Sequence, residues 1–221
     1  MSYPESIPVF QELSLLRGSC ALDVLRESLI ASASPPWRHA HDREESALGI
    51  GAQADEFLAF ERLADEQLPA VGVIFWREDA GYRITNIVPL EAHQLNHHQY
   101  NAALQDFMGR IVVPTANALG LNVKTTAGTQ SPEDWMSADS AGRLKRFSRN
   151  ANKSTGSSHP MDRERWYDFI IGLHSERREL DTEKLARWLE GVEHWSDDAA
   201  IDLVIEYEFG RDLLKQYDRS R

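Results

Sequence analysis

Residues 71–90 read VGVIFWREDAGYRITNIVPL and decide the fold of the first half of this 221-residue chain. Val71–Glu78 and Tyr82–Leu90 are rich in β-branched and aromatic side chains, which are enriched in strands. Residues 79–81 between them form a turn signal, in which Gly81 tolerates a positive φ. The stretch therefore predicts a β-hairpin of two antiparallel strands.

Helical patterns stand on both sides of this hairpin. Before it, Cys20–Ser32 carries leucines three and four residues apart, the spacing of one helix face. After it, Asn96–Leu119 predicts a long helix, because Asn96 and Gln99 have the spacing of a capping box. Pro114 removes a backbone donor and is expected to kink or split that helix. Residues 1–128 are thus predicted to form a mixed α/β half.

Strand signals disappear after Ser131, and the rest of the chain has the period of amphipathic helices. The expected helices are Ala138–Asn152, Pro160–Ser175, Thr182–His194 and Asp197–Tyr217, the last with Ile201, Val204 and Tyr207 as its apolar face. The predicted fold class is therefore α+β, with an antiparallel hairpin and a long helix first, and about four helices over residues 129–221. The pattern is compatible with two domains and with one continuous core.

Composition indicates an acidic cytoplasmic protein. The chain has 24 Lys and Arg residues against 35 Asp and Glu residues, a net charge of −11. Such a balance argues against broad nucleic-acid binding, which depends on neutralising many phosphates. No apolar run is long enough to predict a membrane helix, and the N-terminus lacks the pattern of a signal peptide. Cys20 is the only cysteine, so no internal disulfide is expected.

One segment contrasts with this acidity. Residues 143–153 contain five basic side chains and no acidic one, and a polar loop leads from them to Pro160. On a helix, Lys145, Arg149 and Lys153 share a face, and hydroxyls and free N–H groups follow at the next helix start. The pattern favours a capped and solvated connection between two helices, with phosphate or local nucleic-acid contact as the alternative. The candidate anion site comprises Lys145, Arg146, Arg149, Lys153, Thr155, Ser157, Ser158 and His159.

The histidines give no metal prediction. His39 and His41 stand two residues apart, and His93 and His97 have the spacing of a helical metal pair. However, Asn96 is the expected helix cap, which leaves His93 outside the helix. A zinc site needs three or four converging ligands, and a lone cysteine excludes the common thiolate frameworks. We expect no metal site and no cofactor.

Arg187 and His194 form the candidate catalytic pair, on the predicted helix Thr182–His194. Their spacing resembles the Arg-x(4–6)-His signature of HEPN-type ribonucleases. The resemblance implies that His194 moves protons while Arg187 stabilises a pentavalent phosphate. It covers eight residues, and the β-rich first half departs from the all-helical fold of that family.

The remaining signals favour protein interaction. Tryptophan, tyrosine and arginine are enriched at interfaces, and the candidate anchors are Trp135, Trp166, Tyr167, Trp188 and Trp195. Core packing is the alternative for most of them. Asp202, Glu206 and Glu208 give the last helix an acidic edge. We therefore expect a non-enzymatic interaction or regulatory protein with a protein partner or as a homo-oligomer, a module of a larger assembly or of an antitoxin-like pair. Phosphate binding at the basic segment and ribonuclease chemistry are the alternatives.

Overall fold

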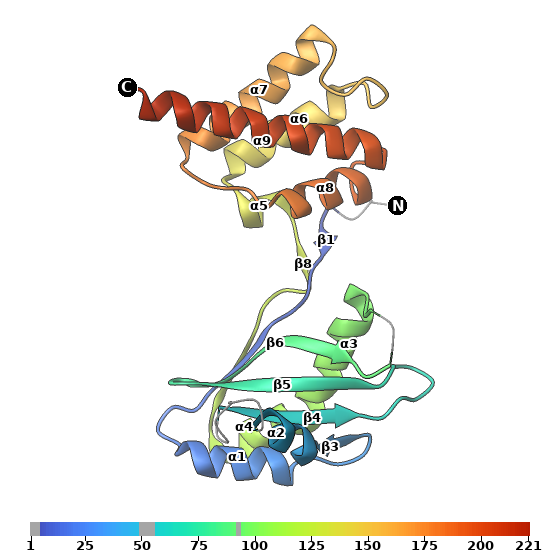
Figure 1. Ribbon diagram of the computed structural model, residues 1–221, viewed down its shortest axis with the longest axis vertical. Helices are drawn as coiled ribbons and strands as arrows, with labels where there is room; N and C mark the ends of the chain where they lie inside the picture. Colours follow the sequence, from blue (N-terminus) through green and yellow to red (C-terminus); the bar gives the residue numbers. More distant parts are fainter. Residues whose placement is uncertain (1–4, 49–55, 92–93) are drawn as a thin grey trace. The chain divides into compact units, whose positions relative to one another are not determined.

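The computed structural model describes residues 5–48, 56–91 and 94–221. The chain divides into two compact units. The sheet unit is Pro8–Gly128, and the helical unit combines the N-terminal residues up to Ile7 with Thr129–Arg221. The fold class is α+β, with an antiparallel sheet and a helical C-terminal half, as the sequence predicts (Figure 1).

Within the described residues, the sheet unit contains a six-stranded sheet in the order β3-β4-β5-β6-β2-β7. The strands are β2 (Leu13–Leu16), β3 (Trp37–His39), β4 (Phe57–Arg62), β5 (Val71–Glu78), β6 (Gly81–Pro89) and β7 (Asn122–Thr125). The predicted hairpin is confirmed: β5 and β6 pair antiparallel over most of their length. The position of β2 between β6 and β7 is a long-range feature that local patterns do not reveal.

Helices pack against this sheet. They are α1 (Leu22–Ala31), α2 (His41–Leu48), α3 (His97–Phe107), the π-helical segment η1 (Met108–Val112) and α4 (Val113–Leu119). The predicted capping box is confirmed, because the Asn96 side chain accepts from the Gln99 N–H at 2.9 Å and the Gln99 side chain accepts from the Asn96 N–H. The predicted long helix is divided into α3 and α4 by the π-helical segment η1. Pro114 lies in the first turn of α4, where its missing N–H costs little.

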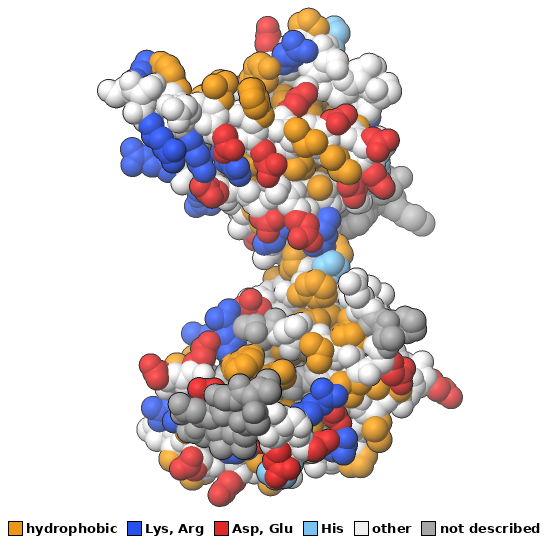
Figure 2. Space-filling view, viewed as in Figure 1, with side chains coloured by type: hydrophobic (Ala, Val, Ile, Leu, Met, Phe, Trp, Pro, Cys, Tyr) orange, Lys and Arg blue, Asp and Glu red, His pale blue; other side chains and the backbone are white. Residues whose placement is uncertain are grey.

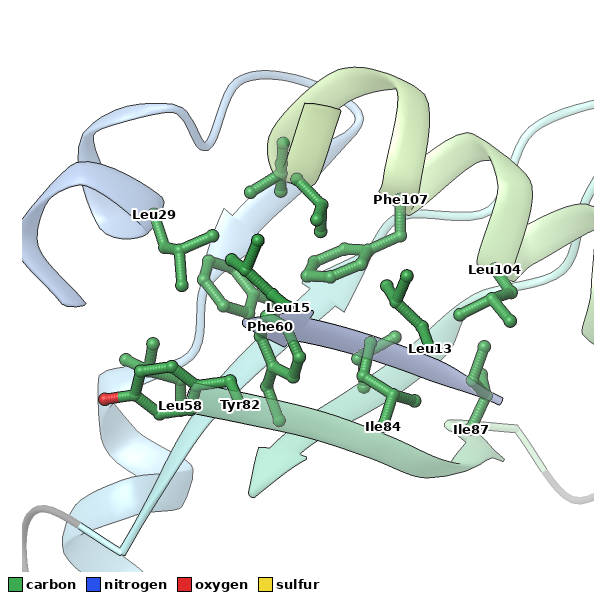
Figure 3. Close-up of a cluster of buried hydrophobic side chains, with 14 of the residues drawn as sticks. Leu13, Leu15, Leu29, Leu58, Phe60, Tyr82, Ile84, Ile87, Leu104 and Phe107 are labelled. Carbon is green, nitrogen blue, oxygen red and sulfur yellow. The ribbon is translucent and has the colours of Figure 1, made fainter. Parts of the chain in front are cut away.

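The core of the sheet unit lies between the sheet and α3. Figure 3 shows Leu13 and Leu15 of β2, Phe60 of β4 and Ile84 of β6 gathered beneath Phe107 of α3. All five side chains are fully buried. Each such burial stabilises the fold by about 1.5–3 kcal/mol relative to exposure.

The helical unit consists of α5 (Pro132–Trp135), α6 (Ala138–Asn150), α7 (Pro160–Ser175), α8 (Thr182–Gly191) and α9 (Asp197–Arg219). The four predicted helices are confirmed, although the third ends three residues early. Their shared core contains Phe147, Trp166, Phe169, Trp188, Trp195 and Tyr207. Short strands β1 (Ile7–Pro8) and β8 (Thr129–Gln130) pair with one another. Among the described residues, none of the helices has the length and apolar character needed to cross a membrane.

The turn at Gly81 yields a stability prediction. Gly81 has φ +147°, and a methyl carbon built on it lies 2.0 Å from the carbonyl oxygen of Leu15 on β2. Because that neighbour is backbone, Gly81→Ala should destabilise the sheet unit by roughly 2–4 kcal/mol. Gly109→Ala is the matched control, since nothing lies within 4 Å of its added methyl carbon. Hydrogen exchange of peptides from β5 and β6 in increasing urea measures the stability of both variants. Equal urea midpoints for Gly81→Ala and Gly109→Ala would refute the clash.

A second prediction concerns acid stability of the helical unit. Glu176, at the end of α7, accepts hydrogen bonds from the hydroxyls of Ser137 and Ser140 at the start of α6. Burial opposes ionisation, but these hydrogen bonds outweigh it and hold the pKa of Glu176 below its ordinary 4.5. A lowered folded pKa stabilises the fold above pH 4.5, and this contribution is lost as the pH falls through the lowered value.

Glu176→Gln should therefore lower the urea midpoint of the helical unit at neutral pH, and its deficit relative to wild type should shrink at about pH 3. Glu208→Gln, on the exposed side of α9, serves as the control with little effect at either pH. A deficit of the same size at both pH values would contradict the assigned role of the Glu176 carboxylate.

Candidate protein-interaction surface

The basic side chains of residues 143–153 are paired with carboxylates of their own unit. Three of the candidate anion-binding side chains lie on α6, and Lys153 follows it. The nitrogen-to-oxygen distances are 2.6 Å for Lys145–Glu133, 2.7 Å for Arg146–Asp168, 3.4 Å for Arg149–Glu5 and 4.0 Å for Lys153–Glu193. The positive charge that the sequence concentrates here is therefore largely compensated within the fold, by acids distant in sequence.

The polar loop after α6 lies against α9. Ser157 is buried and donates to Glu206 of α9 at 2.5 Å, while Thr155 donates to the carbonyl of Asn152. Ser158 and His159 are exposed, and His159 precedes α7 without a capping side-chain bond. A hollow of about 520 Å³ brings Lys153, Thr155, Ser157 and Ser158 together with Asp198, Asp202 and Glu206. Three carboxylates beside one lysine make this hollow unfavourable for an anion.

A buried carboxylate gives the basic segment a structural role. Glu193 is 8% exposed and accepts from Ser148 at 3.0 Å, and the Ser148 hydroxyl in turn accepts from the Trp195 indole at 2.6 Å. Arg149 and Lys153 lie 3.7 and 4.0 Å from the Glu193 carboxylate. A buried charge needs compensation and hydrogen bonds, so these cations stabilise the junction between α6 and the segment after α8.

Arg187 and His194 do not share a helix. The prediction that this helix extends to His194 is wrong, because α8 ends at Gly191. The N–H groups of Glu193 and Trp195 bond back to the carbonyls of Trp188 and Leu189, and His194 has φ +59°. This turn directs Trp195 into the core. The single-face geometry that underlies the ribonuclease resemblance is therefore not present.

The histidines lie in separate settings. His39 contacts Glu44 at 2.8 Å, His41 contacts Glu45 at 3.3 Å, and His97 stacks on Phe10. His93 lies outside the described residues. In residues 5–48, 56–91 and 94–221, no group of three or more His, Cys, Asp or Glu side chains is arranged to hold a metal ion.

Most of the tryptophans predicted as anchors belong to the core. Trp166, Trp188 and Trp195 are buried and Trp135 is half-buried, whereas Tyr167 is 52% exposed. Core packing, the alternative for these side chains, thus accounts for the three buried ones. In the described part of the helical unit, most large exposed apolar side chains lie on α9 and the adjacent side of α7, Tyr167 among them.

An apolar ridge runs along the exposed side of α9. Its members recur every four residues: Ile201, Ile205, Phe209, Leu213 and Tyr217, with 50%, 57%, 72%, 58% and 50% of their surface exposed. On the opposite side of the helix, Ala200, Leu203 and Tyr207 are buried in the core. Figure 2 shows hydrophobic side chains gathered over α9 in the helical unit. We call these five residues the α9 ridge.

A groove beside the ridge extends this surface onto α7. Tyr167 and Ile171 of α7 are each about half exposed, and with Phe209 and Leu213 they line a hollow of about 380 Å³. Gly210 lies at its base, where a methyl carbon would meet the side chain of Ile170 at 3.3 Å. The missing side chain allows α7 and α9 to approach closely, and the groove between them remains open. We call it the α7–α9 groove.

Comparison of the chain with protein-family models, with curated proteins and with solved structures gives no match. Function is therefore inferred from the surface chemistry of the chain itself.

Truncation of Ser148 tests the structural role of the basic segment. Ser148→Ala leaves the buried Trp195 N–H and Glu193 carboxylate without their shared hydroxyl, so it should destabilise the helical unit by about 1–3 kcal/mol. Ser158→Ala, which truncates an exposed serine in the following loop, should cost under about 0.5 kcal/mol. Urea unfolding, monitored by tryptophan fluorescence, compares the stabilities of the two variants. Similar midpoints for the two variants would argue against this network.

Proposed function

We propose that this chain is a cytoplasmic, non-enzymatic interaction module, which binds protein through the α9 ridge and the α7–α9 groove. The observation that carries the proposal is the ridge: five large apolar side chains, each at least half exposed, on one helix. The ridge extends over residues 201–217, about 24 Å at the rise of an α-helix. Single exposed apolar residues are ordinary, but a continuous patch of this kind is typical of an interaction site.

The shape and chemistry of the surface favour a protein as the ligand. The ridge has a groove beside it, so the surface offers both exposed apolar side chains and a place to receive those of a partner. Phe209 and Tyr167 supply aromatic surface, which is enriched in protein interfaces. Asp202 and Glu208 are exposed next to the ridge and provide a polar rim. An antitoxin-like pair, in which an acidic protein masks a basic one, is one form that this function takes.

The alternative of phosphate or nucleic-acid binding receives less support. It depends on Lys145, Arg146, Arg149 and Lys153 presenting uncompensated positive charge. Each of them lies within 4.0 Å of a carboxylate oxygen in the helical unit. A phosphate would have to compete with those carboxylates for the same nitrogen atoms.

Site-specific photocrosslinking tests the proposed function. A benzophenone amino acid placed at Phe209 should give a discrete protein adduct in cells that express the chain, because this position is the most exposed of the ridge. The same amino acid at Glu183, exposed on α8, serves as the matched control and should give none. Mass spectrometry identifies the adduct, which is either a second copy or another protein.

A charged substitution at Leu213, the next ridge position after Phe209, provides the second part of the photocrosslinking test. Leu213→Glu should lower the adduct yield at position 209 severalfold, because it places a carboxylate where apolar contact is expected. Equal labelling at positions 209 and 183, or no adduct at either, would remove the support for an interaction surface on α9.

A further inference from the structure

The distribution of charge along α9 identifies an occupant for the ridge. Within α9, residues 197–208 contain five carboxylates and no Lys or Arg, whereas residues 209–219 contain three basic side chains and two carboxylates. The first half of the helix therefore has a formal charge of −5, and the second half a charge of +1. In Figure 2, acidic side chains gather on the right, where α9 begins, and basic side chains on the left, toward its end.

We propose that the α9 ridge binds a second copy of this chain, with the two α9 helices antiparallel across a two-fold axis. This inference rests on the proposed function and specifies its partner. An antiparallel arrangement places each acidic half against the basic half of the second copy. A parallel arrangement would oppose the two acidic halves, and like charges across an interface are repulsive.

The order of ridge residues suits the same symmetry. Ile205 and Leu213 stand four residues before and after Phe209, and Ile201 and Tyr217 stand eight residues before and after it. A two-fold axis at Phe209 therefore pairs Ile205 with Leu213 of the second copy, and Ile201 with Tyr217 of the second copy. Apolar residues meet apolar residues along the ridge, as a self-complementary interface between identical subunits requires.

Several charges beside the ridge are available for such pairing. Asp198, Asp202, Glu208 and Arg219 have no ion-pair partner in the part of the chain that the structure describes, in contrast to the basic side chains of α6. In the antiparallel register, Asp202 lies opposite Gln216 of the second copy, next to its Lys215, and Asp198 lies opposite Ser220 of the second copy, next to its Arg219. Lys215 already forms an ion pair with the exposed Glu179 at 2.5 Å, but surface ion pairs of this kind contribute little to the free energy of folding.

The apolar surface is large enough to contribute to a dimer. The ridge together with Tyr167 and Ile171 exposes on the order of several hundred Å², the size of the largest patches found on monomers. A standard interface takes roughly 800 Å² from each partner, with an apolar centre and a polar rim. The ridge supplies the centre, the groove accepts projecting side chains, and the flanking charges supply the rim.

A charge-swap experiment on the full chain tests the arrangement. One variant carries Asp198→Lys and Asp202→Lys, and the other carries Lys215→Glu and Arg219→Glu. Sedimentation equilibrium should show a dimer for wild type. For each variant alone, the dissociation constant of the dimer should rise by about tenfold or more, because like charges then face each other. An equimolar mixture of the two variants should recover a heterodimer, in which every acidic half faces a basic half.

The outcomes separate this inference from the proposed function. A wild-type chain that stays monomeric to about 100 μM, well above a typical micromolar dissociation constant, would overturn the second copy as the occupant. A photocrosslinked adduct with a different protein would then still uphold the interaction surface. A wild-type dimer without recovery in the mixture would overturn the antiparallel pairing. Circular dichroism verifies that both variants keep wild-type helicity, as expected because Asp198, Asp202 and Arg219 are exposed and Lys215 is only partly buried.

Discussion

The helix α9 is apolar on two opposite sides, and the helical unit covers only one of them. One side of α9 places Leu203 and Tyr207 in the core, where Tyr207 is 1% exposed and its hydroxyl accepts from the backbone N–H of Leu180. The opposite side carries the α9 ridge. An amphipathic helix at the surface of a monomer normally has a polar outer face. The outer face of α9 departs from that rule over four turns.

The rest of the unit holds this helix in place. Gly210 allows α9 to lie close against Ile170 of α7, and Ser157 fixes the acidic half of α9 to the loop after α6 through Glu206. The basic segment that stands out in the sequence is used inside the fold, where it compensates Glu133, Asp168 and Glu193. On the surface of α9, acidic side chains concentrate in the first half of the helix and basic side chains in the second half. The apolar side chains of the ridge run along both halves.

Local signals in the sequence predict local structure well. The hairpin around Gly81, the cap at Asn96 and most ends of α6 to α9 follow from turn chemistry, hydrogen-bonding side chains and helical period. The end of α8 does not, because Trp195 is drawn into a core built by distant helices. Helical period indicates which residues share a face but not which face the protein covers. The pattern predicts one apolar face for Ile201, Val204 and Tyr207, but Tyr207 is buried and Ile201 is half exposed. The carboxylates that neutralise the basic segment are set by tertiary contact alone.

The most direct measurement is hydroxyl-radical footprinting of the purified chain as its concentration increases, with modification quantified at single residues. If a second copy covers the ridge, modification of Phe209 and Leu213 should fall as the dimer forms. Modification of Trp76 and Phe10, exposed in the sheet unit, should stay constant. Constant and high modification of Phe209 and Leu213 across the dimerisation range, in step with Trp76, would contradict the central claim that the α9 ridge is a self-association surface.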